Sequence, residues 1–153
     1  MAESVKIGDP APNFALFSET GEAVELQDYI GTKSVVLFFY PKDNSAICTK
    51  EVCYFRDNFE EFQKINNAEV IGISSDTEDS HKQFSETLNL PFMLLSDPDE
   101  DVRREYGVPK TLGIFPGRVT YVIDKEGVIR HIFSSQLKYK RHVKEALSAL
   151  KSI

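Results

Sequence analysis

The strongest constraint on the fold is the run Ser34–Tyr40, whose sequence is SVVLFFY. It is rich in β-branched and aromatic residues, and its apolar residues are consecutive: they do not alternate with polar ones. A strand with this pattern is buried on both faces. Pro41 ends the run, because proline has no N–H group to donate to a neighbouring strand. The run therefore predicts a central strand of a sheet.

Gly, Pro and hydrophobic periodicity predict short strands and helices along the rest of the chain. Further strands are expected at Phe14–Glu19, Ala23–Leu26, Glu69–Ser74, Phe92–Leu95, Arg118–Asp124 and Val128–Phe133. Helices are expected at about Ser45–Asn66, Glu78–Leu88, Glu100–Tyr106 and about Tyr139–Leu150, with Thr77 as a cap and Gly107–Gly117 as a loop. Helices between parallel strands imply right-handed crossovers and an α/β layer architecture. The order fits a thioredoxin-like fold, with a central mixed sheet flanked by helices and an N-terminal β-hairpin extension.

Length and charge narrow the class of protein. The chain has 153 residues, which predicts one domain over 1–153. A net charge of −6 argues against nucleic-acid binding. No apolar run approaches the roughly 20 residues of a membrane span, and the N-terminus MAESVKIGDP has no signal-peptide pattern. We expect a cytoplasmic protein, or a stromal protein of an organelle if a transit peptide has been removed.

The two cysteines, Cys48 and Cys53, are too few for a disulfide scaffold, and their spacing is neither CxxC nor that of a zinc knuckle. Residues after the carboxyl end of a buried strand lie at a surface crevice. If Ser45 caps the following helix (Asn44 is the other candidate), Cys48 lies in its first turn. Free N–H groups and the helix dipole favour a thiolate there. Buried free cysteines are also common core residues, so position alone leaves an inert Cys48 open.

The spacing of the cysteines restricts how they can react with each other. Five residues of helix give a rise of about 7.5 Å and a net rotation of about 140°, so the Cα atoms lie roughly 8.7 Å apart. A disulfide tolerates at most about 6.8 Å. Either the pair never bonds, or the first turns of the helix unwind. A reactive thiol near a second thiol is typical of a redox centre whose sulfenic acid is trapped by a resolving cysteine.

The stretch FFYPKDNSAICTKEVCYFRDNFEEF resembles the peroxiredoxin Q group, also called the bacterioferritin comigratory protein group. The family's motif, proline followed by threonine or serine and then cysteine, is met by Pro41, Ser45 and Cys48. The acidic residue of the family is met by Glu51, and its resolving cysteine by Cys53. The resemblance continues through EVIGISSD, HKQFSETLNLPFMLLSD, REYGVP and PGRVTYVIDKEGVI, and so covers nearly the whole chain.

The resemblance implies a monomeric thiol peroxidase that reduces hydrogen peroxide and alkyl hydroperoxides without metal, flavin or haem. Cys48 would be the peroxidatic nucleophile and Cys53 the resolving residue, and thioredoxin or a similar dithiol would reduce their disulfide. Arg118 matches the family's catalytic arginine, which would stabilise the thiolate and hold the peroxide. Ser45 would contribute its hydroxyl. Pro41 would shield the thiolate, and Glu51 would orient the arginine.

One departure from the family lies beside the thiol. The family usually has Thr-Pro-Gly there, whereas this chain has Ser45-Ala46-Ile47. Serine keeps the hydroxyl group, but Ile47 adds bulk and removes the backbone freedom of glycine. We expect this change to affect peroxide access and efficiency instead of the type of reaction.

Two other classes of function remain open on the residues alone. A thioredoxin-like disulfide oxidoreductase is disfavoured by the missing CxxC, and a binding module or chaperone would have an inert Cys48. Single residues also have plainer interpretations: Arg118 as a surface ion pair, Glu51 as a helix-favouring acid, and Arg56 as a structural partner of Asp57. The three histidines, with no metal-ligand spacing, are expected on the surface: His81, His131 and His142.

Overall fold

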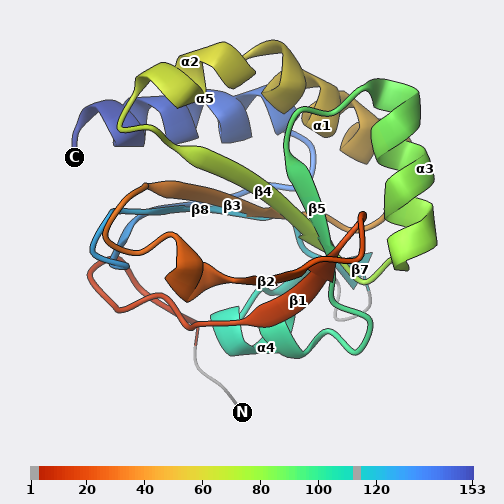
Figure 1. Cartoon of the computed structure of the whole chain (residues 1–153), viewed down its shortest axis with the longest axis horizontal. Helices are drawn as coiled ribbons and strands as arrows, with labels where there is room; N and C mark the ends of the chain where they lie inside the picture. Colours follow the sequence, from red (N-terminus) through yellow and green to blue (C-terminus); the bar gives the residue numbers. More distant parts are fainter. Residues whose placement is uncertain (1–3, 112–114) are drawn as a thin grey trace.

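The computed structural model describes residues 4–111 and 115–153 of the chain. Seven strands form one sheet in the order β2-β1-β5-β4-β3-β8-β9 (Figure 1). These strands are β1 (Ala15–Ser18), β2 (Ala23–Glu25), β3 (Val35–Phe39), β4 (Glu69–Ser74), β5 (Met93–Ser96), β8 (Val119–Ile123) and β9 (Ile129–Ser134). The helices are α1 (Ala46–Asp57), α2 (Phe59–Lys64), α3 (Glu78–Leu88), α4 (Asp101–Tyr106) and α5 (Tyr139–Lys151), and a 3-10 turn covers Leu26–Asp28.

The sheet is mixed, and β3 lies inside it as the apolar run predicts. β3 runs parallel to β4 and antiparallel to β8, and β4 runs parallel to β5. The hairpin β1–β2 joins through an antiparallel pairing of β1 with β5. The last hairpin, β8–β9, adds the antiparallel edge at the other side. The α/β architecture with a hairpin extension is thus confirmed.

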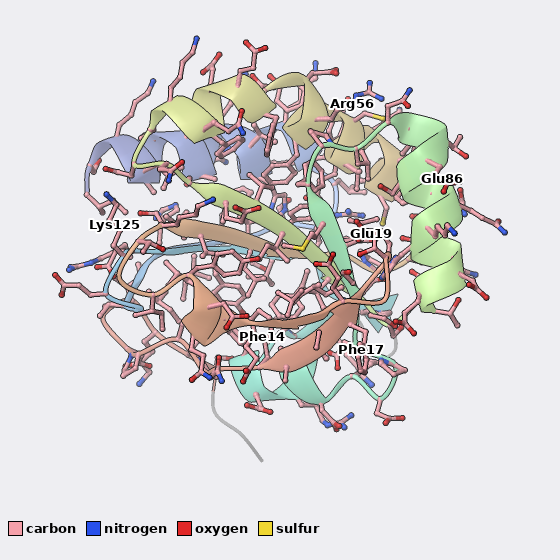
Figure 2. All side chains as sticks on the ribbon, viewed as in Figure 1. Phe14, Phe17, Glu19, Arg56, Glu86 and Lys125 are labelled. Atoms are coloured by element: carbon pink, nitrogen blue, oxygen red, sulfur yellow. The ribbon has the colours of Figure 1, made fainter. Side chains whose placement is uncertain are left out.

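The two faces of the sheet carry separate cores, because successive residues of β3 point to opposite sides. Helices α1, α2 and α5 cover one face, and α4 lies at the other face with the N-terminal hairpin (Figure 1). Val36 and Phe38 pack toward the first group, whereas Leu37 and Phe39 pack toward the second. Side chains fill the space between these layers (Figure 2). Within the described part of the chain, no helix is long and apolar enough to cross a bilayer.

Two details of the expected secondary structure are wrong. The helix expected over Ser45–Asn66 is broken at Asn58, whose backbone leaves the helical region at φ −107 and ψ 9. Its side-chain amide donates to the carbonyl of Tyr54 across 2.8 Å, a local bond that competes with helix continuation. The expected loop Gly107–Gly117 contains a short strand pair, β6 (Lys110–Thr111) with β7 (Phe115–Pro116). Residues 112–114 of that loop lie outside the described residues.

The expectation of surface histidines is wrong for two of the three. His81 and His142 are fully buried, and His131 is half-buried. Each buried ring has polar partners for both nitrogens. His81 lies against Asp43 and the Leu95 carbonyl, and His142 lies against Thr120 and the Ser135 carbonyl. Burial is tolerated because these partners replace the hydrogen bonds of water.

Candidate active site

Cys48 is the third residue of α1, in the first turn as expected. Ser45 is the N-cap residue by position, and its carbonyl accepts the first helical hydrogen bond from the N–H of Thr49 at 2.9 Å. Its hydroxyl does not cap the helix but donates to the carbonyl of Lys42 at 3.1 Å. The N–H groups of this first turn therefore have no side-chain cap, and the helix start next to Cys48 carries partial positive charge.

The thiol of Cys48 is fully buried and belongs to the core under α1. It shares this core with Val52 and Phe55, which follow at helical spacing along the same face. Burial alone would suit an inert core cysteine equally well. The polar side chains that reach the sulfur therefore decide between the two interpretations.

The pairing of β3 with β8 brings Arg118 to Cys48. The two strands are antiparallel, and Phe39 at the end of β3 pairs with Val119 at the start of β8. Arg118 directly precedes β8, so it lies at the end of the sheet where β3 ends and the chain continues toward α1. Its guanidinium donates from Nη2 to the Sγ of Cys48 across 3.4 Å. A residue distant in sequence thus becomes the charged neighbour of the thiol.

The same guanidinium binds Glu51, one helical turn after Cys48. Nη1 of Arg118 lies 2.9 Å from Oε1 of Glu51, and Nε donates to the carbonyl of Gln136 at 3.0 Å. Arg118 is 4% exposed and Glu51 is 0% exposed, so the interpretation of Arg118 as a surface ion pair is wrong. One buried cation therefore serves two acidic groups, the thiol and the carboxyl.

Burial shifts the pKa values of Glu51 and Arg118. It raises the pKa of Glu51 from 4.5 to about 7, against the opposing attraction of Arg118. Burial alone would lower the pKa of Arg118, but Glu51 and Cys48 outweigh burial and raise it. Both pKa values rise because burial dominates at Glu51, whereas the attraction of Glu51 and Cys48 dominates at Arg118. Among the described residues, no donor reaches Oε2 of Glu51.

His142, which was expected on the surface, lies beside Glu51. Nδ1 of His142 is 3.7 Å from Oε2 of Glu51 and 2.8 Å from the hydroxyl of Thr120. Burial, together with the charge of Arg118, lowers the pKa of His142 from 6.5 to about 4, against a hydrogen bond to the Ser135 carbonyl that raises it. The ring is therefore neutral near pH 7, and Arg118 is the cation beside Glu51.

The other predicted site residues flank Cys48 in the chain, before α1 and within it. Pro41 is half-buried directly after β3, and Ile47 is half-buried in the first turn of α1. Cys53 is half-buried in the same helix as Cys48, and both thiols are free. The geometric objection to a disulfide within an intact α1 therefore applies to the observed fold.

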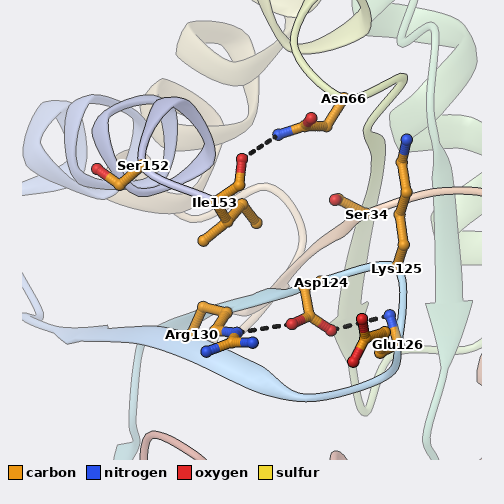
Figure 3. A pocket seen from close by; sticks show the side chains of 8 residues that line it. All are labelled: Ser34, Asn66, Asp124, Lys125, Glu126, Arg130, Ser152 and Ile153. Atoms are coloured by element: carbon orange, nitrogen blue, oxygen red, sulfur yellow. Dashed lines mark hydrogen bonds and ion pairs between the residues drawn. The ribbon is translucent and has the colours of Figure 1, made fainter.

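Arg56 is a structural partner of Asp57, as the sequence predicts. It pairs with Asp57 at 3.1 Å and donates to the Leu88 carbonyl at 2.7 Å. A cavity of about 380 Å³ lies at the opposite end of the sheet and is lined by Ser34, the residue before β3 (Figure 3). Asp124 and Arg130 line it and pair with each other. This cavity is not part of the thiol site.

Three possible metal-ligand side chains, Asp43, Asp76 and His81, have ligand atoms within 4.8 Å of one another. Each is already engaged by the protein. The carboxylate of Asp43 accepts from the hydroxyls of Tyr40 at 2.6 Å and Ser80 at 2.8 Å, and lies 2.7 Å from His81 Nδ1. Asp76 accepts from the backbone N–H of Asp43 at 2.8 Å. The cluster fastens the segment before α1 to β4 and α3.

Comparison with known proteins identifies the family. The model of the AhpC/TSA family matches residues 7–132, which is most of the chain. The chain belongs to the AhpC/TSA family. Within this family it is similar to a chloroplastic peroxiredoxin Q of Oryza sativa subsp. japonica, with 48% identity over 150 residues. The match covers 97% of this chain and 68% of the rice protein.

Solved structures of the AhpC/TSA family agree with the fold. Peroxidoxin BcpB from Mycobacterium tuberculosis superposes with a TM-score of 0.88 at 35% identity, covering 97% of each chain. A PrxQ mutant from Xylella fastidiosa gives 0.88 at 29% identity, covering 99% of this chain and 98% of that one. The thioredoxin-like fold and the peroxiredoxin Q resemblance are confirmed. This AhpC/TSA member is a thiol peroxidase, an oxidoreductase that uses peroxides and a thiol reductant.

The sequence contained a signal for His142 that was overlooked. In this AhpC/TSA chain, the apolar positions Val143, Ala146, Leu147 and Leu150 form one stripe of α5. His142 precedes Val143 and lies one turn before Ala146, so it belongs to that stripe. His81 likewise shares a stripe with Phe84 and Leu88 on α3. A polar residue on an apolar stripe is the pattern that predicts burial with a partner.

Proposed function

We propose that Cys48 is the peroxidatic thiol and that this chain reduces hydrogen peroxide and alkyl hydroperoxides. The observation that carries the proposal is the 3.4 Å contact from Arg118 to the sulfur of Cys48, in the first turn of a helix. A structure of the Xanthomonas campestris bacterioferritin comigratory protein, 30% identical to this chain, is described in terms of alkyl peroxide reduction. That relative supports the same substrate class here.

The first step is an attack of the Cys48 thiolate on one peroxide oxygen. The S–O bond forms as the O–O bond breaks, and the departing alkoxide or hydroxide takes a proton to leave as alcohol or water. Cys48 is oxidised to sulfenic acid. Negative charge moves onto the leaving oxygen, where Arg118 and the N–H groups of the first turn stabilise it. The Ser45 hydroxyl completes the polar wall, and Pro41 limits access by water.

The second step joins Cys48 to Cys53. The Cys53 thiolate attacks the sulfenic sulfur, a disulfide forms and hydroxide leaves as water after taking a proton. Because helical Cα atoms five residues apart are about 8.7 Å from each other, α1 unwinds at its start for this step. Thioredoxin or a similar dithiol then reduces the disulfide by exchange.

Residues 1–153 act as one domain, as a monomer and without a cofactor. Location stays a prediction, in the cytoplasm or in an organelle stroma. Relatives from plants are named as chloroplastic, and these names support the second alternative. The negative charge of the chain continues to argue against a nucleic-acid partner.

The test is peroxide consumption with a thioredoxin system, comparing wild type with Cys48→Ser and Cys53→Ser. Cys48→Ser is expected to abolish consumption. Cys53→Ser is expected to be oxidised once per molecule but not to turn over with thioredoxin. Near-normal turnover of Cys48→Ser would sink the proposal. Reduction of insulin without peroxide consumption would favour the disulfide oxidoreductase, and an unreactive Cys48 would favour a binding module.

A further inference from the structure

A second arginine lies at the same end of the sheet, buried and unused by the proposed chemistry. Arg103 is the third residue of the short helix α4 and is 3% exposed. Its guanidinium donates from Nη1 to the carbonyl of Gly117 and from Nη2 to the carbonyl of Tyr40, each at 2.8 Å. Gly117 and Tyr40 are the residues directly before Arg118 and Pro41. One planar group therefore ties together the two backbone segments that deliver the site.

We propose that Arg103 is a positioning residue of the peroxide-reducing site, holding the backbone before Arg118 and the backbone before Pro41 at a set separation. The inference rests on the proposed function of Cys48 and extends it to a residue that does not touch the thiol. A guanidinium suits this task because its donors point in fixed directions, so two bonds determine a distance.

The backbone of Arg103 is itself held in place. Asp97, buried directly after β5, accepts from the N–H groups of Val102 and Arg103 at 3.3 and 3.0 Å. The carbonyl of Arg103 accepts from the N–H of Val108 at 3.1 Å. The guanidinium lies 5.7 Å from the centre of the Phe39 ring, at the end of β3. The backbone bonds therefore hold Arg103 in place, and its guanidinium packs against Phe39, before any peroxide binds.

The Gly117 side of the link leaves little room for adjustment. A Cβ on Gly117 would lie 2.1 Å from the carbonyl oxygen of Pro109, so the backbone there approaches its neighbour closely. Arg118 follows this tight contact and points its guanidinium at Cys48. A shift of Gly117 is transmitted to Arg118 because only one peptide unit separates them. Misplacement by about 1 Å at a reacting centre can cost a hundredfold in rate.

The charge of Arg103 also faces the site. Burial lowers the pKa of Arg103, and the ionisable groups around it, which are Glu100, Asp97, Tyr121 and Cys48, oppose that shift. A guanidinium keeps its proton in proteins even when buried. Arg103 is thus a second cation, beside Arg118, that interacts electrostatically with Cys48.

The test compares four variants of the full chain: Arg103→Met, Arg103→Lys, Arg104→Met and Tyr106→Phe. Arg104 is the adjacent arginine, exposed and paired with Asp101. Tyr106 lies on the same helix and is buried, and its hydroxyl donates to the Pro12 carbonyl at 2.7 Å. The first control matches the loss of an arginine, and the second matches the loss of a buried hydrogen bond to a carbonyl.

Two readouts separate positioning from stability. The first is the single-turnover rate of Cys48 oxidation by hydrogen peroxide. The second is the pH dependence of alkylation by iodoacetamide, mapped on tryptic peptides, since Lys50 lies between the two cysteines and separates them on cleavage. Alkylation of Cys53 is the internal control, because it reports general opening of α1. A purely structural role would change both cysteines together.

Arg103→Met is expected to slow Cys48 oxidation about tenfold or more and to move its alkylation profile to higher pH, with Cys53 unchanged. Arg103→Lys keeps the charge on a single nitrogen, so we expect a smaller but clear loss. If Arg103→Met does not fold, the rate and the alkylation profile of Arg103→Lys test the proposal. Rates for both variants within twofold of Arg104→Met, or equal losses in Tyr106→Phe, would overturn the proposal. An inactive wild type would instead refute the proposed function.

Discussion

The guanidinium of Arg118 lies 3.4 Å from the sulfur of Cys48, although 70 residues separate them in the chain. The contact exists because β8 begins beside the end of β3, and α1 begins at that same end of the sheet. Arg118 lies in the connection just before β8, and the strand that follows it is paired with β3. A side chain next to a paired strand is positioned more precisely than one far out on a loop.

Loss of this cation is expected to slow the peroxide step. Arg118→Ala alone would leave Glu51 buried without its partner, at a cost of about 3–5 kcal/mol. We therefore predict the outcome for Arg118→Ala combined with Glu51→Gln. The second-order rate of Cys48 oxidation should fall by about 10²–10³-fold, as for removal of an oxyanion donor. Stopped-flow fluorescence or competition with a known peroxidase measures it.

The matched controls are Arg56→Ala and Glu51→Gln alone. Arg56 is a half-exposed arginine near the end of the same α1, and its loss should leave the rate within about twofold. Glu51→Gln keeps a hydrogen-bond acceptor for Arg118 and should retain most of the rate. A double variant as fast as Glu51→Gln would show that Arg118 has only a structural role.

Glu51 predicts a pH dependence of stability. Burial raises its pKa from 4.5 to about 7 in the folded chain. A carboxyl group with a raised folded pKa binds its proton more tightly in the folded state. The contribution of Glu51 to the free energy of unfolding is therefore fully present below pH 4.5, and it is lost as the pH rises through about 7. Replacing Glu51 by Gln removes this loss.

The measurement is urea unfolding of reduced protein between pH 5 and pH 8. The stability of wild type relative to Glu51→Gln should decline across this range by on the order of 3 kcal/mol. His142, whose pKa is lowered to about 4, has the opposite sign and loses stability as the pH falls from 6.5, but it is present in both proteins. Glu60→Gln, at an exposed position of α2, is the control. Parallel profiles for wild type and Glu51→Gln would contradict the prediction.

Oxidation should unwind the start of α1. Formation of the Cys48–Cys53 bond costs several helical hydrogen bonds at about 0.5–1.5 kcal/mol each and displaces Val52 from the core. Hydrogen exchange of residues 46–55 should therefore speed up in the oxidised form. The strand β3, which lies inside the sheet, should keep its protection. Equal protection of 46–55 in both redox forms, with the disulfide confirmed by mass spectrometry, would rule out the unwinding.

Ile47 should limit access to the thiol. It is half-buried in the first turn of α1, next to a sulfur that is fully buried. Ile47→Gly removes this bulk, and we expect faster Cys48 oxidation by tert-butyl hydroperoxide than in wild type. The helix should lose under about 1 kcal/mol. Ala46→Gly, at the exposed preceding position, controls for backbone flexibility, and an equal gain in that variant would exclude a steric role for Ile47.

The sequence predicts the strands and the layers well because burial patterns are local. The limits of β4 and α3, and the cap at Thr77, agree with the structure, since periodicity and capping chemistry act within a few residues. The break at Asn58 was missed because the apolar spacing of Phe55 and Phe59 continues across it. Burial periodicity reports which face is covered, but not whether the backbone stays helical.

The site is only partly predictable from the residues. The place of Cys48 at a helix start follows from the strand, the proline and the cap before it. The contact with Arg118 depends on the register of β8 against β3, which no short-range pattern specifies. The buried roles of His142 and Arg103 depend on which backbone carbonyls and carboxyls the fold brings to them. Only the family resemblance pointed to Arg118.

The break at Asn58 would confine the proposed unwinding of α1 to a small part of the chain. Helical turns melt cooperatively, so one continuous helix from Ala46 to Lys64 would share the disturbance along its length. With the backbone interrupted, α2 has its own first turn and its own core residue, Phe62. We therefore expect oxidation to remodel α1 while α2 continues to cover the hydrophobic core with Phe62. Unchanged exchange of Phe59–Lys64 between the two redox forms would be the signature of this division.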